Sequence, residues 1–181
     1  MTKEGKKKQF RCESLSRLER ASGFGSYQKD KKIVEVLYRT IMMSNAKSVM
    51  LYIPLKMEVN IYPLIERLRK EKKMLYVPFM EGTSFRLVKY RLPLKKKKFG
   101  INEPNDSKQY RIKNIDIAIV PIVGVDVTRR RVGFGKGMYD RFYEKQNKNI
   151  KKTVFVAREL CYSKEIITDD YDVSADMIIT A

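Results

Sequence analysis

The sequence contains no histidine and only two cysteines. The absence of histidine excludes the usual general base, the Ser–His and Cys–His nucleophile pairs and the commonest transition-metal ligand. Cys12 and Cys161 lie far apart, with no second thiol at metal-ligand spacing, so they indicate neither a zinc site nor a disulfide framework. Any chemistry must therefore depend on carboxylates, cations, backbone amides or a bound hard metal.

Long apolar runs are also absent. No stretch approaches the roughly 20 continuous apolar residues of a membrane span, and the opening MTKEGKKKQF lacks the apolar core of a secretory signal. We therefore expect a cytoplasmic protein with no membrane partner. The 181 residues and the 43% apolar content predict one compact domain over residues 1–181, and we expect a monomer.

Acidic residues are few, since 21 Asp and Glu stand against 39 Lys and Arg and leave a net charge of +18. Such a charge attracts nucleic acid, an acidic membrane surface or polyanionic small molecules. Much of it lies in the lysine-rich runs 6–8, 70–73 and 95–98, and runs of this kind are usually solvated surface. The sequence has no RNP aromatic motif, helix-turn-helix or zinc finger. Small molecules are therefore the expected partners, and non-catalytic nucleic-acid binding is the alternative function.

Apolar periodicity predicts an alternation of helices and strands. The predicted helices cover residues 7–21, 31–43, 60–73 and 138 to about 144. The predicted strands cover residues 48–54, 74–79, 85–90, 115–125, 153–157 and 175–180, and residues 92–106 are expected to form a surface loop. This order favours a single α/β domain with a mostly parallel sheet and helices on both faces.

A glycine-rich loop separates the apolar run 115–125 from the last predicted helix. Gly133, Gly135 and Gly137 stand at alternate positions, and glycine lets backbone N–H groups approach a ligand closely. The following helix N-terminus favours phosphate. Three cationic side chains can add ionic contacts: Arg131, Lys136 and Arg141. The spacing is neither that of a Walker loop nor that of a Rossmann loop, and a simple flexible turn is the alternative interpretation.

Several segments resemble the 5-formyltetrahydrofolate cyclo-ligase family. Residues 120–143, VPIVGVDVTRRRVGFGKGMYDRFY, are similar to its signature VPGxxFDxxGxRLGxGxGYYDRxL. Residues 52–60, 99–104 and 170–180 resemble further family segments, in the same order. The resemblance implies an enzyme in which ATP phosphorylates the formyl oxygen of 5-formyltetrahydrofolate. A neighbouring nitrogen then displaces phosphate to give 5,10-methenyltetrahydrofolate, and ADP is released. Such chemistry depends on positioning and charge neutralisation and needs no protein nucleophile.

The resemblance also implies roles for single residues. It implies these ATP-binding residues: Lys7, Arg11, Arg131, Val132, Gly133, Phe134, Gly135, Lys136, Gly137, Met138 and Tyr139. Lys136 and Arg131 are the implied catalytic cations, which neutralise charge on the transferring phosphoryl group. It implies these folate-binding residues: Ile53, Glu58, Phe134, Gly135, Lys136, Gly137 and Met138. Asp140 and Asp172 are the implied ligands of Mg²⁺.

Plainer interpretations remain open for some of these residues. Taken alone, Asp140 and Asp172 also suit helix caps or surface charges, Glu58 suits an acidic residue before a helix, and Phe99 suits a packing anchor.

The chain departs from the family pattern with Met138 in place of tyrosine and with Ile122 and Arg129 in place of glycine, whereas Val125 for phenylalanine and Val132 for leucine keep the polarity. Met138 predicts altered pocket packing. Ile122 and Arg129 predict that non-glycine residues hold the path of the chain.

Overall fold

The computed structural model describes residues 2–96, 102–104 and 114–181. In chain order the elements are α1 (Lys3–Ala21), α2 (Ser26–Met43), β1 (Ser48–Met50), α3 (Tyr62–Lys70), β2 (Met74–Glu81), β3 (Ser84–Lys89), β4 (Leu94–Lys96), β5 (Asn102–Pro104), β6 (Ile117–Pro121), β7 (Gly124–Asp126), β8 (Arg131–Val132), α4 (Met138–Gln146), the short 3-10 helix η2 (Asn147–Asn149), β9 (Thr153–Val156), β10 (Tyr162–Ser163) and β11 (Met177–Ile179). No helix in this described part is both long and apolar enough to cross a membrane.

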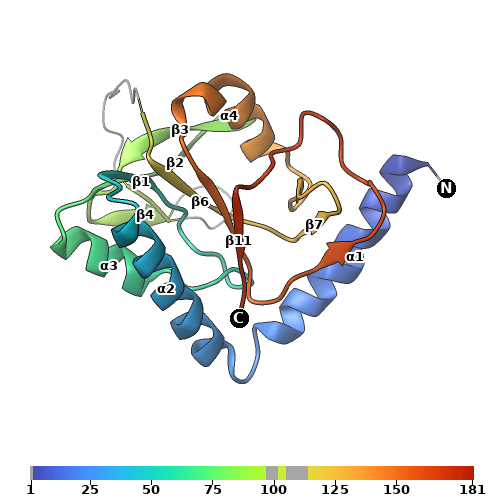
Figure 1. Ribbon diagram of the computed structural model, residues 1–181, viewed down its shortest axis with the longest axis horizontal. Coiled ribbons are helices and arrows are strands. Elements are labelled where there is room, and N and C mark those ends of the chain that lie inside the picture. The colour runs from blue at the N-terminus through green and yellow to red at the C-terminus, as the bar shows by residue number, and fades with distance from the viewer. Residues whose placement is uncertain (1, 97–101, 105–113) are drawn as a thin grey trace.

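The main sheet has six strands in the order β11-β9-β6-β1-β2-β3. All neighbours are parallel except β2 and β3, which form an antiparallel pair. Figure 1 shows α2 and α3 lying together beside this sheet, whereas α1 extends away from them toward β7. The predicted α/β class with a mostly parallel sheet is confirmed.

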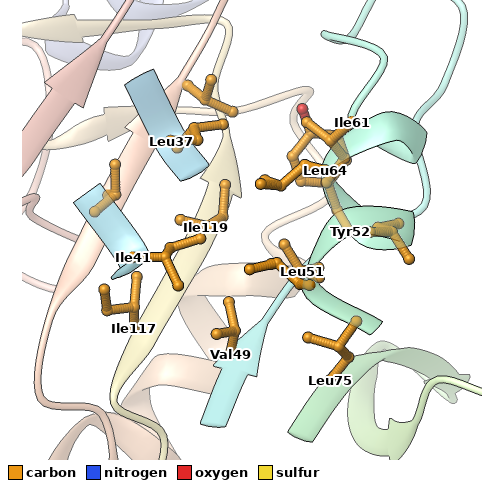
Figure 2. Close-up of a cluster of buried hydrophobic side chains, with 14 of the residues drawn as sticks. Leu37, Ile41, Val49, Leu51, Tyr52, Ile61, Leu64, Leu75, Ile117 and Ile119 are labelled. Carbon is orange, nitrogen blue, oxygen red and sulfur yellow. The ribbon is translucent and has the colours of Figure 1, made fainter. Parts of the chain in front are cut away.

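Both faces of the sheet are covered, because alternate side chains of each strand enter different cores. Val49, Ile117 and Val154 point into one core, where they meet apolar residues of α2 and α3 (Figure 2). The intervening Met50, Ala118 and Phe155 point into a second core with residues of α1 and α4. Helices on both faces were predicted, and the structure confirms them.

The strand order reverses at β1. From β1 the chain adds β2 and β3 on one side, and it later returns to place β6, β9 and β11 on the other. In open α/β sheets, ligands bind outside the carboxyl ends of the strands where the order reverses. The segments that follow β1 and β6 therefore lie where a ligand site is expected.

Several predicted boundaries are wrong. The apolar run 115–125 is two strands, because β6 ends at Pro121 and β7 belongs to a second sheet of order β10-β7-β8. The change of partner is visible in the backbone: the Ile122 N–H donates to Val156 at 3.2 Å, and the Val123 N–H donates to Val132 at 2.9 Å. The strand predicted at 48–54 ends at Met50. An apolar run alone does not tell which sheet each part of it joins.

The predicted surface loop 92–106 contains β4 and β5, which pair as an antiparallel two-stranded sheet. That prediction is wrong for Leu94–Lys96 and Asn102–Pro104. Phe99 and the end of the 95–98 lysine run lie outside the described residues. The two-residue strands β8 and β10 had no apolar pattern by which to predict them.

The two departures from family glycines behave differently. Arg129 has a φ of 58°, in the left-handed region, so a non-glycine residue does hold that turn. The only other non-glycine residues with positive φ in the described ranges are Asn45 and Lys72, so Ile122 has ordinary backbone geometry. Ile122 is buried and replaces a glycine with core volume.

Candidate active site

A cavity of about 480 Å³ opens where the sheet order reverses. Its walls come from the segment after β1, the ends of β2 and β6, and the glycine-rich loop that precedes α4. Eight residues with an implied role line it: Ile53, Glu58, Arg131, Phe134, Lys136, Gly137, Met138 and Tyr139. Lining residues without a predicted role are mostly apolar and include Tyr52, Leu55, Pro78, Met80, Phe85 and Pro121. The cavity therefore offers an apolar body with a few charged groups on its walls, as expected of a small-molecule site.

Arg131 is the most deeply buried cation of this cavity. It lies in β8, its side chain is buried, and its Nε donates to the carbonyl oxygen of Pro121 at 3.0 Å. Its guanidinium carbon lies 4.7 Å from the ring centroid of Tyr139, which is cation–π distance. A Cβ at Gly133 would stand 2.4 Å from the nearest Arg131 nitrogen, so only glycine leaves room for the guanidinium.

The loop after Arg131 combines left-handed glycines with a helix start. Gly135 has a φ of 92° and Gly137 a φ of 60°, conformations that side chains rarely adopt. Gly137 is the N-cap of α4, whose first turn therefore presents free N–H groups beside the exposed Lys136. Val132, by contrast, is fully buried in β8, and its carbonyl is paired with Val123. Its side chain supports the loop and does not face the cavity.

Arg141 has a structural role that the sequence did not predict. Its Nε donates to the carbonyl of Thr83 at 2.9 Å, and its Nη2 donates to the carbonyls of Thr83 and Lys136. The guanidinium therefore fastens the glycine-rich loop to the turn between β2 and β3. The side chain also lines the cavity, and its ionic contact with phosphate stays a prediction.

Helix α1 reaches the glycine-rich loop from the far end of the sequence. The Nε of Arg11 donates to the carbonyl of Gly133 at 2.8 Å. A Cβ placed on Gly135 would lie 3.6 Å from the Arg11 guanidinium, so Gly135 faces α1 and not the cavity. The structure thus brings Arg11 to the loop, whereas it does not place Gly135 among the cavity walls.

Lys7, one turn before Arg11, forms an ion pair with Asp172. Asp172 is buried and also accepts a hydrogen bond from the Asp169 N–H at 2.8 Å. Asp140, in the first turn of α4, has a buried Oδ1 with no hydrogen-bond partner among the described residues. The charges of Asp169, Asp172 and Asp140 all raise the pKa of Tyr171, with the hydrogen bond to Asp169 first. Asp140 and Asp172 therefore both lie within electrostatic range of Tyr171.

Glu58 stands on the opposite wall of the cavity. Its Oε2 accepts the Leu55 N–H at 2.9 Å, and its own N–H donates to the Leu55 carbonyl at 2.9 Å. Burial raises the pKa of Glu58 to about 7, against the opposing Leu55 hydrogen bond and the positive charges of Arg131 and Arg158. The carboxyl is therefore poised to gain or lose its proton near neutral pH.

The chain matches the model of the 5-formyltetrahydrofolate cyclo-ligase family over residues 3–181. It belongs to this family. The family and the cyclo-ligase class of enzyme predicted from the motifs are thereby confirmed.

Relatives of the cyclo-ligase agree with this membership. It is 28% identical over 152 residues to the 5-formyltetrahydrofolate cyclo-ligase of Haemophilus influenzae, covering 80% of this chain and 81% of that one. It is 21% identical over 193 residues to the mouse (Mus musculus) 5-formyltetrahydrofolate cyclo-ligase, covering 99% and 95%.

Solved structures resemble it as well. The NMR structure of Aquifex aeolicus 5,10-methenyltetrahydrofolate synthetase superposes with a TM-score of 0.77 at 29% identity, covering 96% of this chain and 89% of that one. A 5,10-methenyltetrahydrofolate synthetase from Mycoplasma pneumoniae has the same fold, with a TM-score of 0.75 at 23% identity and coverage of 96% and 97%.

No role was predicted from the sequence for Asp126, a buried carboxylate of the cyclo-ligase. It is fully buried at the end of β7 and accepts hydrogen bonds from Thr128, Ile167 and Thr168. Burial alone would raise its pKa, but these hydrogen bonds outweigh burial and lower the pKa to about 2. Its place in the 120–143 signature was the one available signal, and the structure shows a structural role there.

Proposed function

We infer that this cyclo-ligase uses ATP to close the 5-formyl group of 5-formyltetrahydrofolate into the ring of 5,10-methenyltetrahydrofolate, with release of ADP and phosphate. The observation that carries this function is the joining of two unlike walls in one cavity. One wall is apolar and carries Glu58, and the other carries Lys136 and the start of α4. A flat apolar substrate and a triphosphate can therefore meet in it.

The folate end of the site is built around Glu58. A carboxylate accepts hydrogen bonds only, and the aminopyrimidine face of folate presents donors. Ile53 and Met138 supply apolar wall beside it. Met138 stands where the family has a tyrosine. Its thioether packs against the second core as an adaptable apolar group, so the cavity wall stays apolar at this position.

The phosphate end of the site is built around the glycine-rich loop. The N–H groups at the start of α4 and the charge of Lys136 suit the triphosphate, and Lys7 and Arg11 approach from α1. Arg131 is held by Pro121 and Tyr139, so its charge is fixed before substrate arrives. Fixed charges near the formyl oxygen stabilise the transferring phosphoryl group, and attack by the neighbouring nitrogen then expels phosphate.

Asp140 and Asp172 fit a magnesium ion that travels with the nucleotide. The buried Oδ1 of Asp140 is an acceptor to which no residue in the described part of the chain donates. The described residues contain no group of three His, Cys, Asp or Glu side chains that could hold a metal alone. Mg²⁺ commonly takes one or two carboxylates and completes its octahedron with phosphate oxygens and water. When bound there, the ion neutralises charge on the phosphates.

The proposed function is tested by mixing purified protein with 5-formyltetrahydrofolate and following the absorbance of methenyltetrahydrofolate. Product should form when ATP and Mg²⁺ are present and should not form when ATP is omitted. Absence of turnover with both substrates and the metal would overturn the proposal.

The remaining expectations are proposed in the same terms. We propose a cytoplasmic monomer of one domain that acts on small molecules and has no nucleic-acid or membrane partner. Light scattering tests the monomer. Filter binding of RNA and DNA at physiological salt tests the rival function, because tight and strongly salt-dependent binding would favour it.

A further inference from the structure

A buried ion pair joins α2 to the end of β9, close to the cavity but outside its walls. The Nε of Arg158 donates to Oδ1 of Asp30 at 2.7 Å, and its Nη2 donates to Oδ2 at 2.9 Å. Asp30 is 7% exposed and Arg158 is 6% exposed. Two parallel hydrogen bonds fix the relative orientation of the carboxylate and the guanidinium.

Both members of this pair also hold the segment that follows β1. Oδ2 of Asp30 accepts the Asn60 N–H at 3.1 Å. Nη1 of Arg158 lies 3.5 Å from the carbonyl oxygen of Lys56 and donates to the Ser22 hydroxyl at 2.9 Å. Glu58 stands midway between Lys56 and Asn60, so the pair holds the backbone on both sides of it.

Several further hydrogen bonds lie within residues 52–60, and just before them the Leu51 N–H donates to the carbonyl of Tyr76 at 2.8 Å. Leu55 and Glu58 bond to one another, and the Tyr52 hydroxyl donates to the Val59 carbonyl at 2.9 Å. Internal bonds fix the shape of the segment but not its place relative to the glycine-rich loop. Tyr52, Ile53 and Val59 pack in the first core and hold the segment against the sheet. Asp30 and Arg158 add polar contacts on both sides of Glu58.

A role in positioning also suits the energetics of buried ion pairs. Because both charges must leave water, such a pair often stabilises a fold no better than apolar residues of the same volume. Here the pair supplies a hydrogen-bond donor and an acceptor that contact two backbone atoms of one segment and so orient it.

We propose that Asp30 and Arg158 are positioning residues for the folate substrate, which hold residues 52–60 so that Glu58 faces the cavity. The inference rests on the proposed function, because it takes Glu58 as the group that binds folate. It places two residues, 128 positions apart and absent from the cavity walls, in the support of one wall.

The test compares Arg158→Met, Arg158→Lys and Asp30→Asn with the wild-type protein. The matched control is Arg17→Met, which removes an ion pair between Arg17 and the neighbouring Glu159 at the surface. The KM for 5-formyltetrahydrofolate should rise about tenfold or more in Arg158→Met, as for other residues that orient a ligating group. The KM for ATP should stay within about twofold of the wild-type value, since the position of Glu58 does not affect the wall that binds the triphosphate. The control should leave both constants unchanged.

A second readout needs no substrate. Hydrogen exchange at the Leu55, Glu58 and Asn60 amides of the ligand-free protein should be faster in Arg158→Met than in the wild type. Arg158→Lys keeps the charge but loses the planar fork, so it should show the same changes at smaller size. If Arg158→Met does not fold, Arg158→Lys and Asp30→Asn decide the question.

Folded variants with a wild-type folate KM would overturn the proposal, as would unchanged exchange at these amides. A wild-type protein that does not turn over folate would instead overturn the proposed function, and the exchange data would still report on the hold that Arg158 has on the segment.

Discussion

Lys7 and Asp172 form an ion pair across 165 positions of sequence, and both side chains are largely buried. The proposed function gives them opposite targets, because Lys7 suits a phosphate oxygen and Asp172 suits the magnesium ion. In the ligand-free protein each therefore neutralises the other. Binding of the metal–nucleotide complex would replace one ion pair by two new ones.

This exchange makes Lys7→Met a test of the nucleotide site. The variant should raise the KM for ATP about tenfold and leave the KM for folate unchanged, since Lys7 lies on the triphosphate side. Thermal unfolding should show a smaller rise in Tm on addition of ATP and Mg²⁺ than in the wild type. The control is Lys8→Met, because Lys8 lies on the same helix and its side chain is exposed. An unchanged KM for ATP would show that Lys7 does not bind the nucleotide.

Lys136 should matter for the chemical step and not for folding. Its side chain is exposed on the glycine-rich loop, so Lys136→Ala should leave Tm unchanged. Loss of one fixed charge that acts on the transition state typically costs about 10²–10³ in kcat. Steady-state kinetics measures this, with the exposed Lys148→Ala as control. A kcat within about threefold of the wild type would contradict the catalytic role.

Gly133→Ala tests the space that the Arg131 guanidinium occupies. The new Cβ would stand 2.4 Å from an Arg131 nitrogen, so the guanidinium must move off Tyr139 and Pro121. A displaced catalytic group should lower kcat about 10²-fold. Gly23→Ala, where the nearest atom is 3.3 Å away, should have wild-type kinetics. Equal activity of the two variants would show that Arg131 does not act from its present position.

Glu58 should make the stability of the ligand-free protein depend on pH. Its pKa is about 7 in the folded protein against an ordinary 4.5, so the folded state keeps a proton that the unfolded chain has lost. Stability from this group is therefore present at low pH and declines as the pH rises from about 4.5 to 7. Glu58→Gln stays neutral, and its Tm should exceed that of the wild type at pH 8 but not at pH 4. Parallel Tm curves for the two proteins would contradict the raised pKa.

Asp126 should have the opposite dependence. Its pKa of about 2 lies below the ordinary 3.8, so the stability it contributes is present above pH 4 and is lost as the pH falls toward 2. Asp126→Asn should lower the free energy of unfolding by about 2–3 kcal/mol at pH 7, because a buried acceptor of several hydrogen bonds loses its charge. Denaturant unfolding at pH 7 and pH 3 measures both effects. A cost that is equal at the two pH values would show that the charge is not what matters.

Local patterns predicted those parts of the fold that depend on local physics. Helix α2 was predicted from Ile33, Leu37 and Ile41, because a 3.6-residue period must point to one side, and all three side chains are fully buried. The glycine-rich loop was predicted from spacing because its left-handed turns require glycine at fixed positions. The division of residues 115–125 was not predictable in this way, since both of its strands are apolar and differ only in their partners.

The residues of the candidate site show the same difference between local and long-range features. The sequence alone indicates Gly133, Gly135, Lys136 and Gly137, because they lie within five consecutive residues. It does not indicate Arg158, because nothing near that residue shows that its guanidinium will meet Asp30, 128 positions earlier. The same holds for Arg141, whose binding to the Thr83 carbonyl depends on how α4 packs against the turn after β2. Long-range pairing of this kind follows from topology, which single-residue patterns do not encode.

The placement of α1 has a consequence for the order in which the protein matures on the ribosome. Lys7 is made 165 residues before its partner Asp172, and Arg11 is made 122 residues before its partner Gly133. The lysine-rich helix therefore stays in solvent until these partners have been made, and its positive charge favours the solvated state. A nascent chain can assemble the sheet around β1 and β2 early, yet it has no complete nucleotide site until the segment around Asp172 has emerged.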